Sequence, residues 1–317
     1  MRFIYSGFLF ILFTAFSIAQ NPEVQLKNVS DTILNTNRTL KINGPINAMK
    51  TMQKLFPGKL YHFSDHNDFI SWNCKSCKPK AYVDVNGEEG DQLFPYTEGV
   101  ATRLLADIDY SDSKGNQFKF FAFNHSNFDM DGLQTGRFSG GLLGVAKFAK
   151  NGNTWEMKSF QPAIAAFGAF AQCPTPKLLQ IGEDQYAFTL LHVNGGGGGP
   201  FAGYLYLVVG LDGKYQPIME VPEYELTNIE STSWSSTYTV EKNTTKKYFR
   251  DIIIKTKGYF NKAAKTEDEF EVDLPAEIAP MAKTKKLFNF EIERRFSFNG
   301  KRYNLVGKPT VKFSNIK

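Results

Sequence analysis

Short apolar runs separated by turn residues dominate the chain from about residue 60 onward. Six pairs of runs each enclose a turn. The pairs are 100–110 with 117–123, 142–148 with 154–160, 178–181 with 186–191, 204–210 with 215–219, 238–240 with 248–255, and 288–298 with 301–306. Their turns lie, in the same order, at 111–115, 151–152, 182–184, 212–213, 243 and 299–300. Asn-Gly and Asp-Gly supply the positive φ angles that tight hairpin turns need. The pattern therefore predicts an all-β protein of antiparallel hairpins and meanders.

Two arrangements of these hairpins are open. The units between residues 142 and 219 are weakly alike, because each has an apolar strand, a Gly/Asn/Asp turn and then an aromatic residue: Trp155, Tyr186 or Tyr215. Such repetition is typical of propeller blades, but their spacing is usually regular. The irregular spacing here favours a multi-sheet sandwich or an incomplete barrel over a propeller-like array.

One short N-terminal helix is predicted before the strands begin. Pro45 suits the first helical position, and Pro57-Gly58 ends the segment, so the helix is expected over 45–56. Ile46, Met49, Gln53 and Phe56 share one face of this helix, and three of these four residues are apolar.

The first nineteen residues have the pattern of a cleavable secretory signal. Arg2 provides the positive charge, residues 8–16 are apolar, and Ser17-Ile18-Ala19 is a small-x-small cleavage site. The apolar run is shorter than the roughly 18 residues that a membrane-spanning helix needs, and no later segment reaches that length. The sequence therefore predicts a secreted or periplasmic protein with no transmembrane segment after signal cleavage.

The rest of the chain divides by composition. Residues 20–44 form a polar N-terminal arm with room for one edge strand, and residues 45–317 form the mostly β globular region. Apolar patterning lapses near residues 223–236, where Ser and Thr collect, so a weak domain boundary is expected there.

Charge is distributed unevenly. Residues 20–241 have 18 Lys and Arg against 23 Asp and Glu, whereas residues 242–317 have 18 against 9. The basic C-terminal third either binds an anionic partner or faces the acidic part of its own chain. A contact with the acidic part of its own chain is the favoured interpretation. An exported protein without a binding motif for DNA or RNA is not expected to bind nucleic acid.

The cysteines allow more than one chemistry. Cys74 and Cys77 form a C-x-x-C pair, which in an oxidising compartment favours a disulfide. His62, His66, Cys74 and Cys77 also have residue types that suit tetrahedral zinc, which is the minority reading. Cys173 stands alone and is expected to be a small buried residue.

An acidic loop offers a weak calcium site. Asn127, Asp129 and Asp131 alternate with other residues and precede Gly132, which resembles the first half of a calcium loop. Phe138 stands where the bidentate Glu of such a loop would lie, so an ordinary Gly-ended turn is the favoured interpretation.

A run of glycines follows His192 and Asn194. Residues 195–199 are all Gly and precede Pro200. A phosphate-binding loop would need a Lys and a helix after the glycines, and neither is present. The run is therefore predicted to be a flexible hairpin loop. Beside His192 and Asn194, two roles are open for it: lining a pocket or acting as a lid.

No catalytic motif can be named. A G-x-S-x-G sequence is absent, and carboxylates such as Glu98, Asp107 and Asp109 are candidates only by residue type. The sequence favours a non-catalytic exported protein, without a cofactor, that binds a glycan, a peptide or an envelope partner. The alternative is an extracytoplasmic hydrolase using a carboxylate pair or a metal-bound water near His125, Asp129 and Asp131.

Overall fold

Local turn chemistry decides where the chain reverses. The computed structural model describes residues 24–62, 67–87, 92–94, 96–127, 138–195, 199–242, 245–265 and 271–317. Gly152, Asp212, Gly213 and Gly300 all have positive φ, as the Asn-Gly and Asp-Gly turns require. The described strands pair antiparallel within their sheets, and the predicted all-β antiparallel fold is confirmed.

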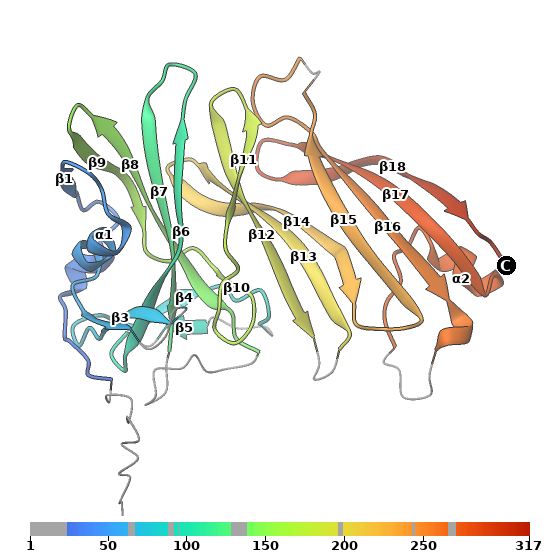
Figure 1. The fold of residues 1–317 in the computed structure, drawn as a ribbon, viewed down its shortest axis with the longest axis horizontal. Coiled ribbons are helices and arrows are strands. Elements are labelled where there is room, and N and C mark those ends of the chain that lie inside the picture. Colours follow the sequence, from blue (N-terminus) through green and yellow to red (C-terminus); the bar gives the residue numbers. More distant parts are fainter. Residues whose placement is uncertain are drawn as a thin grey trace, which may run out of the picture.

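The strands form two large sheets and one small one (Figure 1). In spatial order the first sheet contains β1 (Lys41–Asn43), β9 (Thr154–Gln161), β8 (Gly141–Asn151), β7 (Gln117–Ser126), β6 (Val100–Ser111), β3 (Asp68–Trp72) and β2 (Lys59–His62), with β10 (Ala166–Phe167) beside β8. The second sheet contains β11 (Lys177–Gly182), β12 (Gln185–Gly195), β13 (Phe201–Leu211), β14 (Lys214–Thr227), β15 (Thr232–Val240), β16 (Ile252–Asn261), β17 (Leu287–Phe298) and β18 (Tyr303–Ser314). The small sheet pairs β4 (Lys80–Tyr82) with β5 (Gln92–Phe94).

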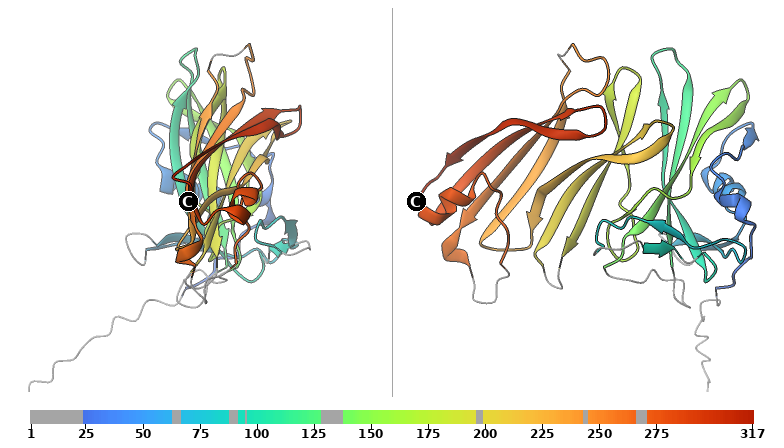
Figure 2. Two further views of the ribbon diagram at one scale, coloured as in Figure 1. Left: turned by 90° about the vertical axis from the view of Figure 1, so that its right-hand side faces the viewer. Right: turned by 180° about the vertical axis from the view of Figure 1, so that it is seen from behind.

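The two eight-stranded sheets agree with the sandwich alternative rather than with a ring of similar blades. They lie next to one another along the long axis of a thin molecule (Figure 2). The chain passes from the first sheet to the second after β10. The predicted boundary at residues 223–236 lies inside the second sheet, where Leu226 pairs with Trp234.

Helix α1 (Ala48–Leu55) covers the outer side of the first sheet. The predicted helix began at Pro45, but Asn47 is the N-cap, and its side-chain oxygen accepts a 3.0 Å hydrogen bond from the Lys50 N–H. Met52 and Leu55 are fully buried in a cluster with Trp72 of β3. The helix thus begins later than predicted, and Met52 and Leu55 are not residues of the predicted face. Of that face, Phe56 is fully buried, whereas Ile46 and Met49 are partly buried against the same cluster.

A second short helix, α2 (Ala279–Thr284), was missed because Pro275 and Pro280 interrupt its sequence. Pro280 lies in its first turn, where a missing N–H is tolerated. Ile278 is fully buried and packs with Phe288 and Phe290 of β17. The segment therefore fills one side of the second sheet. Two short 3₁₀ helices lie at Asp31–Leu34 and Lys262–Ala264.

The second sheet curls into a half-barrel. Ile181 of β11, Leu207 of β13, Ile254 of β16 and Tyr303 of β18 belong to one buried cluster. Because β11 and β18 are the two edge strands of this sheet, a shared cluster means that the sheet folds back toward itself.

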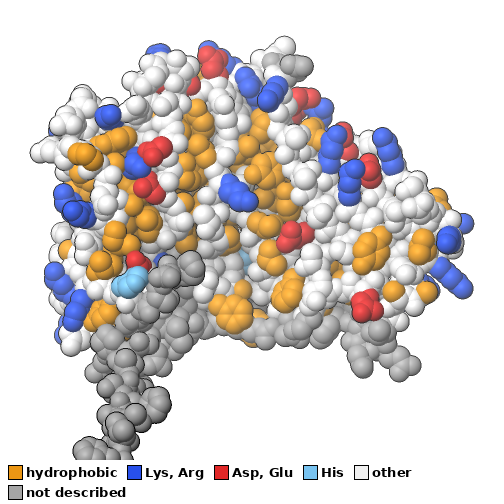
Figure 3. All heavy atoms as spheres, viewed as in Figure 1, with side chains coloured by type: hydrophobic (Ala, Val, Ile, Leu, Met, Phe, Trp, Pro, Cys, Tyr) orange, Lys and Arg blue, Asp and Glu red, His pale blue; other side chains and the backbone are white. Residues whose placement is uncertain are grey.

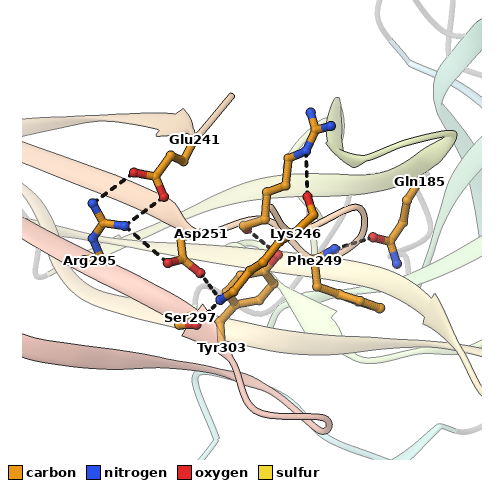
Figure 4. Close-up of polar contacts among 9 residues, drawn as sticks. Gln185, Glu241, Lys246, Phe249, Asp251, Arg295, Ser297 and Tyr303 are labelled. Atoms are coloured by element: carbon orange, nitrogen blue, oxygen red, sulfur yellow. Dashed lines mark hydrogen bonds and ion pairs between the residues drawn. The ribbon is translucent and has the colours of Figure 1, made fainter. Parts of the chain in front are cut away.

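Residues 245–251 strap this half-barrel across its edges (Figure 4). The Arg250 N–H donates a 2.8 Å hydrogen bond to the Ile181 carbonyl, and the Tyr303 hydroxyl donates a 2.9 Å bond to the Arg250 carbonyl. Phe249 has a positive φ and stacks on Phe298 at a ring-centre distance of 3.9 Å. The sequence predicted a strand over 248–255. Its first four residues form this strap instead, because their backbone groups bond to the sheet edges.

Charged side chains fix the same strap. Asp251 pairs with the ammonium group of Lys246 at 2.6 Å and with Arg295 at 3.3 Å. Arg295 also pairs with Glu241, and Lys246 donates to Ser297 (Figure 4). Burial works to raise the pKa of Asp251, but hydrogen bonds from Lys246 and Ser297 outweigh it and hold the pKa below its usual value.

Candidate functional site

The contact between the two sheets has a packed middle and two open ends. Phe120 of β7 stacks on Phe188 of β12 at 3.8 Å between ring centres, and both are buried with Phe167 of β10. At one end, beside the last residues of β12, lies a pocket of about 440 Å³. We name it the amide pocket; its walls are Val85, Asn86, Phe138, His192, Asn194, Gly195, Ala202, Tyr204, Tyr206 and Glu220.

Strand alternation brings two of these side chains to the same wall. His192 and Asn194 are two residues apart on β12, so they face the same side of the sheet. Tyr204 lies on the neighbouring strand β13, where it is the register partner of His192, and its ring centre lies 5.9 Å from that of the histidine. Gly195, the first residue of the glycine run, lies at this pocket with His192 and Asn194, and residues 196–198 of the run lie outside the described residues.

Gly168 holds the histidine and one amide together. Its N–H donates a 2.8 Å hydrogen bond to Nδ1 of His192, and its carbonyl accepts a 2.6 Å bond from the Asn86 side chain. Gly168 has a φ of +80°, and a Cβ there would meet the Gln172 carbonyl oxygen at 1.9 Å. Only glycine therefore fits at this position.

The bond from Gly168 sets the tautomer of His192. A backbone N–H can only donate, so Nδ1 must accept and the proton of the neutral ring lies on Nε2. Burial lowers the pKa of His192, although the charge of Asp84 opposes this effect. The ring is therefore neutral at physiological pH and presents a donor at Nε2.

The two amides are oriented without ambiguity. The Asn86 NH₂ group donates to the Asp84 carboxylate at 3.0 Å and to the Gly168 carbonyl, so both of its protons are used. Its oxygen accepts from the Asn194 NH₂ group, while the Asn194 oxygen accepts from the Gly195 N–H at 2.8 Å. In the part of the chain that the structure describes, the second N–H of Asn194 has no protein acceptor and is available to a ligand.

Acceptors and aromatic surface complete the walls. Glu220 accepts a 3.2 Å hydrogen bond from the Tyr206 hydroxyl and is otherwise exposed. Burial, followed by the charge of Glu220, raises the pKa of Tyr206 above its usual value, so this phenol remains a donor. Phe138 is 68% exposed at the rim and adds an aromatic ring to this wall.

A second hollow of about 590 Å³ continues from the amide pocket across β12. Asn194 and Gly195 line both spaces, and Leu191, Val193 and Phe170 line the second one. Phe170 is 53% exposed.

The predicted disulfide is confirmed. Cys74 and Cys77 are bonded to each other, and Cys173 is free and buried. Burial raises the pKa of the Cys173 thiol well above its usual value, so it stays protonated. In the bonded state neither Cys74 nor Cys77 has a thiolate to offer zinc.

The metal hypotheses remain predictions. Asp129 and Asp131 of the calcium hypothesis and His66 of the zinc hypothesis lie outside the described residues, whereas Asn127 is described and exposed. His62 forms a hydrogen bond with Asp68. Within the described ranges no three His, Cys, Asp or Glu side chains group as a metal site would need.

His125 lies in the core of the first sheet and not at a surface. It is fully buried, and Phe56 packs edge-on against its ring at 4.9 Å between ring centres. Trp72 donates to the Thr102 hydroxyl at 2.8 Å, so that hydroxyl can donate to Nδ1 of His125 at 2.7 Å. Burial, opposed by the Pro162 carbonyl, lowers the pKa of His125 to about 3. Its role in this structure is packing.

The described carboxylates named as catalytic candidates are engaged elsewhere or exposed. Asp107 and Asp109 both pair with the Lys119 ammonium group, at 2.7 and 2.9 Å. Glu98 is exposed in the turn before β6.

Several residues of the amide pocket were not singled out from the sequence, among them Asn86, Tyr204 and Glu220. Asn86 sits 108 positions before Asn194, and Tyr204 and Glu220 lie on two further strands. The local signal in the sequence, the alternation of His192 and Asn194 before the glycine run, points to those two residues and not to the missed ones.

No protein-family model, curated protein or solved structure matches this chain. Among the described residues, no helix is long and apolar enough to span a bilayer.

Proposed function

We propose that this protein is an exported, non-catalytic binding protein whose amide pocket takes a saccharide. The observation that supports this most is the set of groups facing one space: donors on Asn194 and His192, an acceptor on Glu220, and aromatic surface from Tyr204 and Phe138. Sugar hydroxyls both donate and accept hydrogen bonds, and sugar rings have apolar faces. The pocket complements both properties.

Preorganisation strengthens the proposal. The Asn86 side chain forms hydrogen bonds with Asp84, Gly168 and Asn194. Its role is therefore to fix the Asn194 amide before a ligand arrives. A fixed donor loses less conformational entropy on binding than a mobile one.

The described walls favour binding over glycoside hydrolysis. That reaction needs two carboxyl groups facing the scissile bond. Glu220 is the one carboxylate among the described residues that line the amide pocket. The hydrolase alternative therefore stays a prediction that rests on the sequence around Asp129 and Asp131.

Export is supported by two features. The leader at residues 1–19, which lies outside the described residues, has the secretory pattern, and disulfides such as Cys74–Cys77 persist in oxidising compartments. Sequencing the protein from fractionated cells should give an N-terminus at Gln20. Cytosolic material beginning at Met1 would argue against export.

Binding is tested on an array of neutral oligosaccharides with fluorescently labelled protein. We expect retention by a subset of glycans. The Asn194→Ala variant should bind these about ten-fold or more weakly, because it removes a ligand hydrogen bond and the partner of Asn86. Asn304→Ala, an amide change on β18, is the matched control and should bind normally. No retained glycan, or equal binding by Asn194→Ala, would overturn the proposal.

A further inference from the structure

The opposite end of the contact between the sheets contains a third hollow, of about 420 Å³. We name it the lysine cleft, because Lys147, Lys158 and Lys214 line it together with Tyr110, Phe118 and Tyr186. The turns after β6 and β11 meet above it, at the top of Figure 1, where the Tyr186 hydroxyl donates a 2.9 Å hydrogen bond to the Ser111 carbonyl. Its shape is thus fixed by contacts between the two sheets.

Aromatic rings form one wall of the lysine cleft. Tyr110 stacks on Phe118 at 5.2 Å between ring centres, and Tyr186 lies 4.7 Å from Tyr110. All three side chains are only partly buried, so ring surface remains open to a ligand. Such rings pack well against the apolar faces of sugar rings.

Lys147 is held in this wall without a carboxylate. Its ammonium nitrogen lies 4.4 Å from the centre of the Phe118 ring and 5.6 Å from that of Tyr110. No Asp or Glu in the described ranges is within ion-pair distance of Lys147. Burial lowers the pKa of this lysine, although the charge of Asp112 opposes that effect.

Lys119, on the neighbouring strand β7, differs from Lys147 in having carboxylate partners. It is also buried, but two carboxylates, Asp107 and Asp109, neutralise it. A partly buried ammonium group without such a partner is costly unless a ligand supplies the opposite charge. Lys147 therefore has the position of a ligand-binding cation rather than that of a structural ion pair.

The two carboxylates at the rim are already committed. Asp112 accepts hydrogen bonds from the Lys114 and Asn116 backbone N–H groups and from the Asn116 side chain. Asp184 accepts from the Ser113 N–H and hydroxyl. In the described part of the chain, neither carboxylate forms an ion pair with Lys147 or Lys214, whereas Lys158 is paired with Glu156 at 2.9 Å. Lys147 and Lys214 are therefore the two lysines that can interact with an incoming anion.

We infer that the lysine cleft is a second binding site, which takes a carboxylate-bearing ring of an acidic saccharide. The carboxylate binds Lys147, with Lys214 at the exposed rim, and the sugar ring lies against Tyr110 and Tyr186. This site is independent of the amide pocket, because the buried contact of Phe120 and Phe188 separates the two.

The test is calorimetric titration of the purified protein with trigalacturonate, with its methyl ester, and with citrate. The trimer should bind, the uncharged ester should bind about ten-fold more weakly, and citrate should not compete. Lys147→Met, which keeps the aliphatic stem against the rings, should weaken trigalacturonate binding about ten-fold, and Lys214→Gln should weaken it several-fold.

Lys150→Met is the matched control, because Lys150 lies on the same strand over Trp155 and outside the cleft. It should bind trigalacturonate like the unmodified protein, and so should Asn194→Ala. Absent binding, unchanged binding by Lys147→Met, or equal binding of ester and acid would overturn the inference. These results do not depend on whether the amide pocket binds a neutral glycan.

Discussion

The backbone N–H of Gly168 donates a 2.8 Å hydrogen bond to Nδ1 of His192. This bond ties the imidazole of the amide pocket to the loop that also anchors Asn86. It exists only while Nδ1 is unprotonated, so the geometry of the pocket depends on the charge of one ring.

Saccharide binding at the amide pocket should therefore weaken in acid. The pKa of His192 is lowered from 6.5 by burial, so binding should persist at pH 6.5 and weaken only below it, as protonation breaks the Gly168 bond. Titrations from about pH 8 to about pH 4 measure this. The His62→Ala variant, which changes an exposed histidine, should give the same profile. Constant affinity down to the lowest pH would contradict the assigned role of His192.

His125 should make the stability of the fold depend on pH. Its pKa is lowered from 6.5 to about 3, so the unfolded chain takes up a proton as the pH falls below 6.5, whereas the folded chain does not. The free energy of unfolding should therefore decrease as the pH falls below this value. Urea unfolding at about pH 7 and about pH 5 tests this. The His125→Phe variant should lose part of the slope between these two conditions, and an unchanged slope would argue against a buried neutral His125.

The Asp251 cluster should stabilise the strap across the half-barrel. Asp251→Asn leaves Lys246 and Arg295 without a shared carboxylate and should lower the free energy of unfolding by about 1–2 kcal/mol, a modest loss because both cations are partly exposed. The pKa of Asp251 is depressed below 3.8, so this contribution is present above that pH and is lost as the pH falls through the lower, folded value.

The control for Asp251→Asn is Glu183→Gln, which removes an ion pair to Lys247 on the same strap with both partners more than half exposed. Urea unfolding at neutral pH should show a much smaller change for this variant than for Asp251→Asn, because solvent screens an exposed ion pair. Equal effects of the two substitutions would mean that the Asp251 cluster has no special part in holding the strap.

The disulfide should add a modest amount of stability. Closing the short loop from Cys74 to Cys77 limits the unfolded chain little, so replacing both residues by Ala should lower the free energy of unfolding by about 2 kcal/mol. Intact mass should rise by about 2 Da on denaturing reduction. Cys173→Ala should keep this mass change. No change in mass, together with one bound zinc ion per chain, would support the zinc hypothesis instead.

Hairpins were predictable because their signals are local. Gly152, Gly213 and Gly300 reveal the turn residues directly, and the six predicted strand pairs correspond to pairs in the structure, apart from the strap at residues 245–251. That segment failed because its apolar residues, such as Phe249, suit a strand, whereas its bonds reach distant edges. Sequence patterning reports which residues are apolar, but not which edge of a sheet they meet.

The candidate site was less predictable for the same reason. The pairing of Asn86 with Asn194 spans 108 residues and depends on how the two sheets adjoin. Lys147 looks like any exposed lysine in the sequence, and only its position against Phe118 and Tyr110 sets it apart. Hydrophobic side chains also gather over the strands on the face shown in Figure 3, so apolar surface alone does not identify a site.

The most direct test of the account is an NMR titration that follows the side-chain NH₂ signals of asparagine with a glycan retained on the array. Asn194 should show the largest shift, followed by Asn86, because one binds the ligand and the other holds it in place. Signals of Asn289 and Asn304, on β17 and β18, should stay constant. Shifts confined to β15–β18, or unchanged Asn86 and Asn194 signals at saturation, would contradict the amide pocket as the binding site.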